Sequence, residues 1–95
     1  MAEAIARIDT PRASDHLRAL CARWARGLEA EFGTVEGRVN FEVAAAHLHA
    51  EPGRLTLHLI ARDEATLARL ARAVAQRLRL LGGGEALIVA WDCAA

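Results

Sequence analysis

Apolar residues recur with a period of about 3.6 in two stretches of this chain and with a period of two elsewhere. In the first helical stretch we expect Thr10 to be the N-cap, Pro11 to open the helix, and Gly27 to end it in a left-handed C-cap. Its apolar stripe consists of Ala13, Leu17, Leu20, Cys21, Trp24 and Leu28. In the second stretch, Asp63 is the expected N-cap and Gly82–Gly84 the expected end. That stripe consists of Leu67, Leu70, Ala71, Val74, Leu78 and Leu81.

Alternation with a period of two predicts a first strand over Ala4–Ile8, a short strand near Glu31–Gly33, and a turn over Thr34–Gly37. Further apolar runs that alternate in the same way are Val39, Phe41 and Val43, then Ala46, Leu48 and Ala50, then Leu55, Leu57 and Leu59. The pair Pro52-Gly53 predicts a turn between the last two runs. A final strand over Leu87–Trp91 is apolar on both faces, so we expect it to be central in the sheet or covered.

The resulting order is β-α-β-β-β-α-β. Each helix has one apolar stripe and most strands have one apolar face, which favours two layers of structure. The sequence therefore predicts an α+β sandwich in which two helices pack on one face of an antiparallel sheet of about five strands. Residues 1–95 are expected to form a single domain.

Composition narrows the function classes. Apolar residues make up 54% of the chain and charged residues 25%, which is typical of a globular domain. The formal net charge is zero, so we expect neither a nucleic-acid partner nor a membrane partner. Residues 1–9 lack the apolar region of a signal peptide, and no apolar run is long enough to span a membrane. We therefore expect a cytoplasmic protein whose two cysteines, Cys21 and Cys93, are reduced.

Histidines cluster on the strands that flank Pro52-Gly53. A two-residue or four-residue loop there places His47 opposite His58 and makes His49 a diagonal neighbour. Three imidazoles on one sheet face form a candidate site for Zn²⁺, Ni²⁺ or Cu²⁺. The simpler alternative is a solvated sheet face that happens to carry histidines, since no carboxylate obviously supports these imidazoles.

Two surfaces are candidates for partners. The first surface is the helical layer, since the helices carry most of the arginines whereas most acidic residues lie on strands and turns. This pattern indicates either a basic face that binds an acidic or phosphate-bearing partner, or an ordinary solvated surface. The sheet face away from the helices is expected to carry Ile5, Ile60, Ala86, Ile88 and Ala90. We expect a homodimer or a protein partner to cover that face, unless these are scattered exposed apolar residues.

Signatures of catalysis are missing from the pattern. Cys21 lies in an apolar stripe with His16 on the opposite helix face, so an inert buried thiol is expected. Gly82–Gly84 follow a helix, whereas a phosphate-binding loop precedes one. Ser14 has no matched base, and Trp24 and Trp91 are expected in the core. The sequence therefore predicts no catalytic residue and no bound cofactor.

Several short motifs, in order along nearly the whole chain, resemble an uncharacterised bacterial family, the domain of unknown function 2218. They are Thr10–Ser14, Leu20-Cys21 with Trp24, Gly37–Phe41, Leu55–Leu57 and Glu85–Trp91. The resemblance implies a two-layer fold similar to that of the TATA-binding protein, without a nucleic-acid role. It also implies an association with iron metabolism, because similar domains are attached to siderophore-interacting flavoproteins in some bacteria.

The chain departs from the family pattern at two places. Arg23 and Arg26 stand where histidines are common, and Val43–Ala46 replace a Phe-Gly-Thr-Cys stretch. Any metal or thiol chemistry that used those residues is therefore not expected here.

The leading hypothesis is a non-enzymatic binding or accessory domain of unknown ligand, associated with iron or siderophore metabolism. An alternative is a small protein that binds a divalent metal or a metabolite through His47, His49 and His58. A weaker alternative is an enzyme whose active site forms only across a dimer interface.

Overall fold

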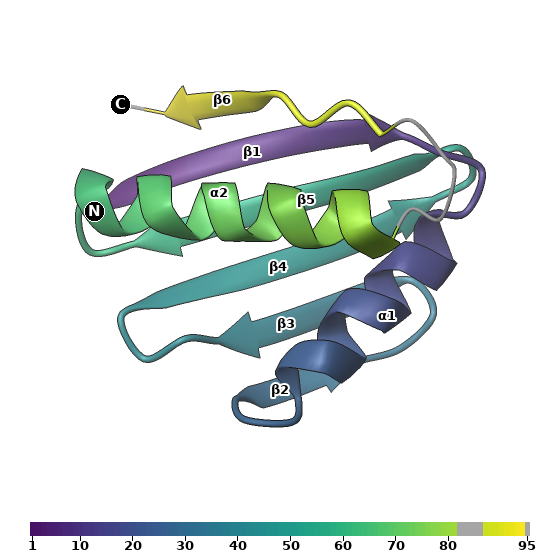
Figure 1. Cartoon of the computed structure of the whole chain (residues 1–95), viewed down its shortest axis with the longest axis horizontal. Coiled ribbons are helices and arrows are strands. Elements are labelled where there is room, and N and C mark those ends of the chain that lie inside the picture. Colours follow the sequence, from purple (N-terminus) through teal and green to yellow (C-terminus); the bar gives the residue numbers. More distant parts are fainter. Residues whose placement is uncertain (82–86, 95) are drawn as a thin grey trace.

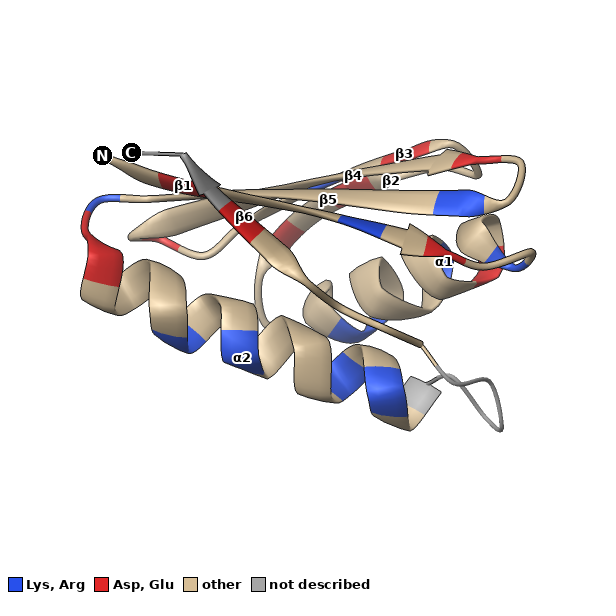
Figure 2. Ribbon diagram, turned by 90° about the horizontal axis from the view of Figure 1, so that it is seen from above, with Lys and Arg blue, Asp and Glu red and all other residues tan. Residues whose placement is uncertain are grey.

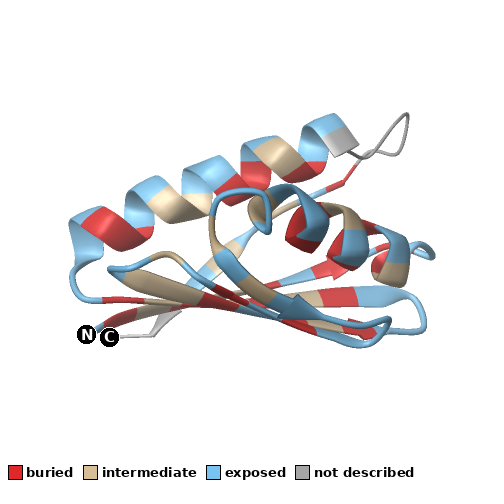
Figure 3. Ribbon diagram, turned by 90° about the horizontal axis from the view of Figure 1, so that it is seen from below, coloured by how far each residue is buried: buried red, intermediate tan, exposed pale blue. Residues whose placement is uncertain are grey.

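The computed structural model describes residues 1–81 and 87–94, and within them six strands and two helices form two layers (Figure 1). The strands are β1 (Ala2–Asp9), β2 (Glu29–Phe32), β3 (Glu36–Asn40), β4 (Ala44–Glu51), β5 (Arg54–Ala61) and β6 (Trp91–Ala94). The helices are α1 (Ala13–Trp24) and α2 (Glu64–Leu81). Both helices lie on the same side of the sheet (Figure 3). The predicted α+β class and two-layer arrangement are therefore confirmed.

All neighbouring strands pair antiparallel, in the order β2-β3-β4-β5-β1-β6. The sheet has six strands where about five were predicted. The short strand expected near Glu31–Gly33 is β2, at Glu29–Phe32, and it pairs fully with β3, from Glu29 opposite Asn40 to Phe32 opposite Gly37. β1 lies between β5 and β6, so the first strand of the chain is in the interior of the sheet.

The prediction for the last strand is wrong in its position and its bounds. β6 begins at Trp91 and pairs with β1 at the edge of the sheet, whereas residues 87–90 form no strand. Leu87 is buried and Val89 packs against the core, while Ile88 is 80% exposed. An extended segment laid on the core therefore produced the alternating pattern without any strand pairing.

The helix boundaries also differ from expectation, except at Asp63. α1 begins at Ala13 with Arg12, not Thr10, as its N-cap, since the His16 backbone N–H donates to the Arg12 carbonyl at 3.0 Å. Thr10 Oγ1 accepts a hydrogen bond from the backbone N–H of Arg12 (3.1 Å) in the turn before the helix. The helix ends at Trp24, and Gly27 is not in a left-handed conformation. At α2, Asp63 Oδ1 accepts the Thr66 backbone N–H at 2.7 Å, as an N-cap should. The predicted end at Gly82–Gly84 lies outside the described residues.

The run Val39, Phe41 and Val43 does not stay in one strand. β3 ends at Asn40, and the chain turns through Glu42, whose φ is +77°. Phe41 instead packs edge-on against Trp24 of α1, with ring centroids 5.2 Å apart. This aromatic contact and the turn explain why the apolar alternation continues past the strand.

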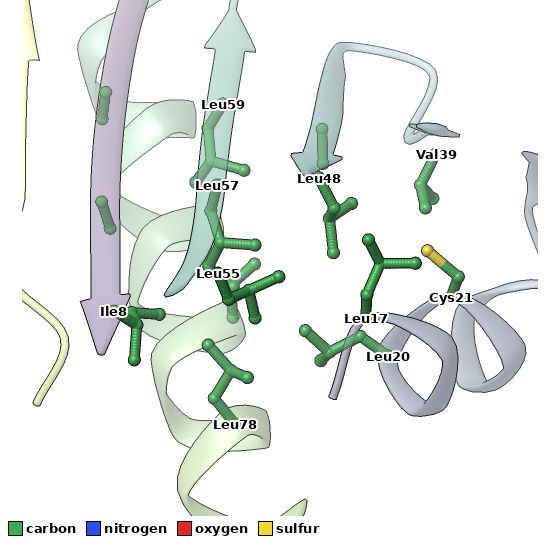
Figure 4. Packing of buried hydrophobic residues seen from close by; sticks show 14 of the residues in the cluster. Ile8, Leu17, Leu20, Cys21, Val39, Leu48, Leu55, Leu57, Leu59 and Leu78 are labelled. Carbon is green, nitrogen blue, oxygen red and sulfur yellow. The ribbon is translucent and has the colours of Figure 1, made fainter. Parts of the chain in front are cut away.

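The core lies between the helices and one face of the sheet, where alternate strand residues meet the helix stripes (Figure 4). Its largest fully buried side chains include Ile8, Leu17, Leu20, Leu55, Leu57, Leu59 and Leu78. The thiol of Cys21 lies over Gly37 of β3, where an added Cβ would be 2.7 Å from Sγ. Glycine at this position therefore lets α1 approach the sheet closely. None of the described helices is long and apolar enough to cross a lipid bilayer.

Candidate functional site

The sheet face opposite the helices carries no helix in the described part of the chain (Figure 3). Because strand side chains alternate, this open face receives every second residue of the strands. One row of directly opposed neighbours crosses the sheet from β2 to β6: Glu31, Arg38, His47, His58, Ile5 and Asp92. The candidate site is the centre of this row and the residues beside it.

His47 and His58 lie directly opposite each other on β4 and β5, and their ring centroids are 6.3 Å apart. This is the register predicted from the Pro52-Gly53 turn, and it is confirmed. Glu51 faces Arg54 at the end of the same hairpin. Gly53 has a φ of +85°, a conformation that a tight turn requires and that glycine adopts without steric cost.

Carboxylates stand beside two of the imidazoles, so the expectation that none supports them is wrong. His58 Nε2 donates a hydrogen bond to Glu3 Oε1 at 3.1 Å, and this glutamate comes from β1. His49 lies between Glu36, 3.7 Å from its Nδ1, and Glu51, 4.0 Å from its Nε2. The position of Glu3 follows from β1 pairing with β5, which the local sequence pattern does not reveal.

The histidines thus divide into a facing pair and a separate residue. His47 and His58 approach each other, whereas His49 is half-buried beside its own carboxylates. Among residues 1–81 and 87–94, no three histidine, cysteine, aspartate or glutamate side chains are grouped so that they could hold a metal ion. Metal binding by His47, His49 and His58 therefore stays a prediction.

A hollow of about 590 Å³ lies over β2 to β5 and includes the histidines. The open-face side chains that line it are Glu31, Glu36, Arg38, His47, His49, Thr56 and His58. Arg38 is opposed by Glu31 on one side and by His47 on the other. The lining therefore offers a guanidinium, imidazoles, a hydroxyl and carboxylates within one concave surface.

The other candidate residues lie away from this hollow. Cys21 is fully buried, and burial raises the pKa of its thiol to about 11, so it is the inert thiol that was predicted. His16 is buried on α1, and Ser14 Oγ donates to the Thr34 carbonyl at 2.6 Å. The side chain of Cys93 lies outside the described residues.

Sequence comparison places the chain in a family. A family model described as "Uncharacterized protein conserved in bacteria (DUF2218)" matches residues 5–92. The chain belongs to the DUF2218 family. Its fold is similar to the NMR structure of PA4090 from Pseudomonas aeruginosa, with 27% sequence identity and a TM-score of 0.82, over 97% of this chain and 96% of that one. No curated protein matches the sequence.

One of the DUF2218 departures named above lies away from the open face, and the other reaches it. Arg23 and Arg26 are exposed at and just after the end of α1. Val43 precedes β4, Ala44–Ala46 are its first residues, and Ala45 lies on the open face opposite Ile60. The histidines come from later in β4 and from β5, so they are other residues than those at which the chain departs from the family.

The two predicted partner surfaces differ in how well the structure forms them. Figure 2 shows that arginines recur along α2, and Arg69, Arg72 and Arg79 are exposed. The apolar patch is smaller than predicted. Ile5 and Ile60 are half-buried on the open face, Ile88 and Ala90 precede β6, and Ala86 lies outside the described residues.

Proposed function

We propose that this DUF2218 protein is a non-enzymatic binding domain that holds a small polar ligand on the open face of its sheet. The observation that carries the proposal is the hollow of about 590 Å³, lined mostly by polar side chains from neighbouring strands. Its volume is within the range of about 300–1,000 Å³ typical of small-molecule sites. No helix of the described residues covers it.

The groups around the hollow are held in place by the sheet. His47, His58 and Arg38 stand at fixed register positions on paired strands, and the other face of those strands is packed in the core. Binding groups on rigid strands lose little conformational freedom when a ligand binds. Arg38 is suited to a carboxylate or phosphate, while Glu31 and Glu36 are suited to donors on the same ligand.

The test is a set of ¹H–¹⁵N NMR titrations of the untagged protein with ferric citrate, flavin mononucleotide, haem and inorganic phosphate. The iron compounds and the flavin are chosen because the family resemblance implies iron metabolism. We expect at least one compound to shift the amides of β3, β4 and β5 saturably, and Arg38→Ala to weaken that binding. Arg72→Ala, on the exposed side of α2, is the matched control and should bind as the wild type does.

Thermal unfolding supplies a second measurement. A ligand present at about 100 times its Kd stabilises the folded state by about 2.7 kcal/mol, which raises the Tm of a domain this size by roughly 10–20 °C. If no compound shifts the β3–β5 amides, or if the shifts map to α2, the proposal of a small ligand on the open face is wrong.

We also infer a cytoplasmic location and a homodimer through the part of the open face around Ile5 and Ile60, which do not line the hollow. The free, buried thiol of Cys21 supports a reducing compartment, and half-buried Ile5 and Ile60 supply apolar contacts for a second copy. Light scattering at high concentration tests the dimer, since a mass equal to one chain contradicts it. If an enzyme active site forms only across that interface, its activity should disappear when dilution separates the two chains.

A further inference from the structure

We infer that His47 and His58 bind one divalent transition-metal ion, with Glu3 orienting His58 and with His49 taking no part. This inference rests on the proposed function and names a class of ligand for the same face. It follows from the pairing of the two imidazoles, from the hydrogen bond that fixes one of them, and from the separate contacts of His49.

The distance between the rings suits a shared ion. Zinc lies about 2.0–2.1 Å from an imidazole nitrogen, so two rings that share one ion have centroids roughly 5–6 Å apart. The centroids of His47 and His58 are 6.3 Å apart. The His47 side chain is exposed, so a small rotation about its side-chain bonds brings the rings into range without disturbing the core.

The hydrogen bond to Glu3 determines which nitrogen of His58 can bind. Because Nε2 donates to Glu3 Oε1 at 3.1 Å, the lone pair of the neutral ring is on Nδ1. A carboxylate that accepts the second ring N–H is the usual support of a metal-binding histidine, since it fixes the ring and raises its basicity. Glu3 is therefore a positioning residue, and Nδ1 of His58 is the binding atom.

His49 is excluded by its surroundings. It lies opposite Thr56 in the register, and the carboxylates of Glu36 and Glu51 flank its two ring nitrogens. These are ion-pair distances rather than hydrogen bonds, and the ring contact between histidines in the described residues joins His58 to His47, not to His49. Two protein ligands leave the remaining coordination positions to water or to donor atoms of a ligand in the hollow.

Substitution of Arg38 should have opposite effects on the binding of a metal ion and the binding of an anionic ligand. It lies directly opposite His47, so its positive charge repels a cation bound there. Arg38→Ala is therefore expected to strengthen metal binding modestly. The same substitution is expected to weaken the binding of a carboxylate or phosphate ligand.

The experiment is calorimetric titration of the untagged Cys93→Ser chain with ZnCl₂, NiCl₂ and CuCl₂. The Cys93→Ser substitution removes the Cys93 thiol, a potential metal ligand whose side chain lies outside the described residues. We expect one ion per chain, with Cu²⁺ bound more tightly than Ni²⁺ or Zn²⁺. His47→Ala and His58→Ala should each weaken binding at least tenfold, while His49→Ala, the matched control, should stay within about twofold.

The role of Glu3 has its own readout. Glu3→Gln should weaken binding by about 10–100-fold, and Glu3→Asp should restore part of the loss. Electron paramagnetic resonance of the Cu²⁺ complex should show two nitrogen ligands in the wild type and one in His47→Ala. Urea unfolding of each variant checks that the chain folds, which we expect because these side chains are exposed or half-buried.

The inference is overturned if His49→Ala loses as much affinity as His47→Ala, if the histidine pair can be removed without effect, or if one ion binds two chains. Its failure is distinct from failure of the proposed function. If no metal ion binds but flavin mononucleotide or phosphate shifts the β3–β5 amides, the metal site is wrong and the binding face stands.

Discussion

The contact between Gly37 and Cys21 makes a quantitative prediction about how α1 packs on the sheet. Replacing Gly37 with alanine would put a Cβ 2.7 Å from Cys21 Sγ and 3.4 Å from Leu17 Cδ2. Real Cβ atoms do not approach this closely, so α1 or β3 must move. Overpacking of a well-packed core costs about 1–3 kcal/mol. The backbone at Gly37 is not in a left-handed conformation, so the cost is steric.

A second substitution should relieve the clash. Cys21→Ala removes the sulfur and, alone, leaves a small cavity that costs roughly 1 kcal/mol. In the double variant the new methyl group at position 37 occupies the space that Sγ leaves. We therefore expect the free-energy losses of the single variants to be far from additive, with a favourable coupling of about 1–3 kcal/mol.

The assay is urea unfolding of the wild type, both single variants and the double variant, followed by tryptophan fluorescence. Trp24 is half-buried against Phe41 and reports on α1 directly. A loss of 1 kcal/mol corresponds to about 4–8 °C in Tm for a domain of this size. Gly27→Ala is the control, because nothing lies within 4 Å of its added Cβ and its backbone suits alanine.

Two results would refute this reasoning. If Gly37→Ala is as stable as Gly27→Ala, α1 does not press on β3 at this point. If the two losses add in the double variant, the clash is with atoms other than Sγ of Cys21. A change in the denaturant slope m would show that the substitution altered more than the stability of the folded state.

Three further predictions concern single positions. Gly53→Ala should cost about 1–2 kcal/mol because φ is +85° there, and a urea midpoint unchanged from the wild type would contradict this. In a Cys93→Ser background, the Cys21 thiol, with its pKa raised to about 11, should react with Ellman's reagent at pH 8 only after unfolding; fast reaction in the folded chain would disprove its burial. The hydrogen bond from Thr66 lowers the pKa of Asp63 below 3.8, so this cap stabilises the folded chain above that pH and loses its effect as pH falls. Asp63→Ala should therefore be less stable than the wild type at pH 7, and the difference between their urea midpoints should shrink as the pH falls through the lowered pKa of Asp63; a constant difference would count against the cap.

Features set by neighbouring residues could be predicted from the sequence. The hairpin register, with His47 opposite His58, follows from the Pro52-Gly53 turn and from the need to keep Leu48 and Leu57 on one face. The Asp63 cap has an equally local cause, because a carboxylate before a helix accepts a nearby backbone N–H.

Features set by distant residues could not be predicted. Glu3 reaches His58 only because β1 lies beside β5, and no local pattern determines that strand order. The apolar alternation of Leu87 and Val89 is the same for a strand and for an extended segment laid on the core. In both cases the deciding interaction joins parts of the chain that are far apart in sequence.

The interior place of β1 has a consequence for how the chain is synthesised. β1 is made first, yet its partners β5 and β6 are made much later, with Glu3 opposite both Ile60 and Ala94. Because synthesis adds about 5–20 residues per second, several seconds pass in which β1 has no paired strand and its apolar face is uncovered. The β4–β5 hairpin can form as soon as it is made, because its strands are neighbours in the sequence. Pairing of β1 with β5 and β6 instead requires closing the longest loops between paired strands of the sheet. Translation speed and early chaperone contact should therefore affect the yield of folded protein most strongly through β1.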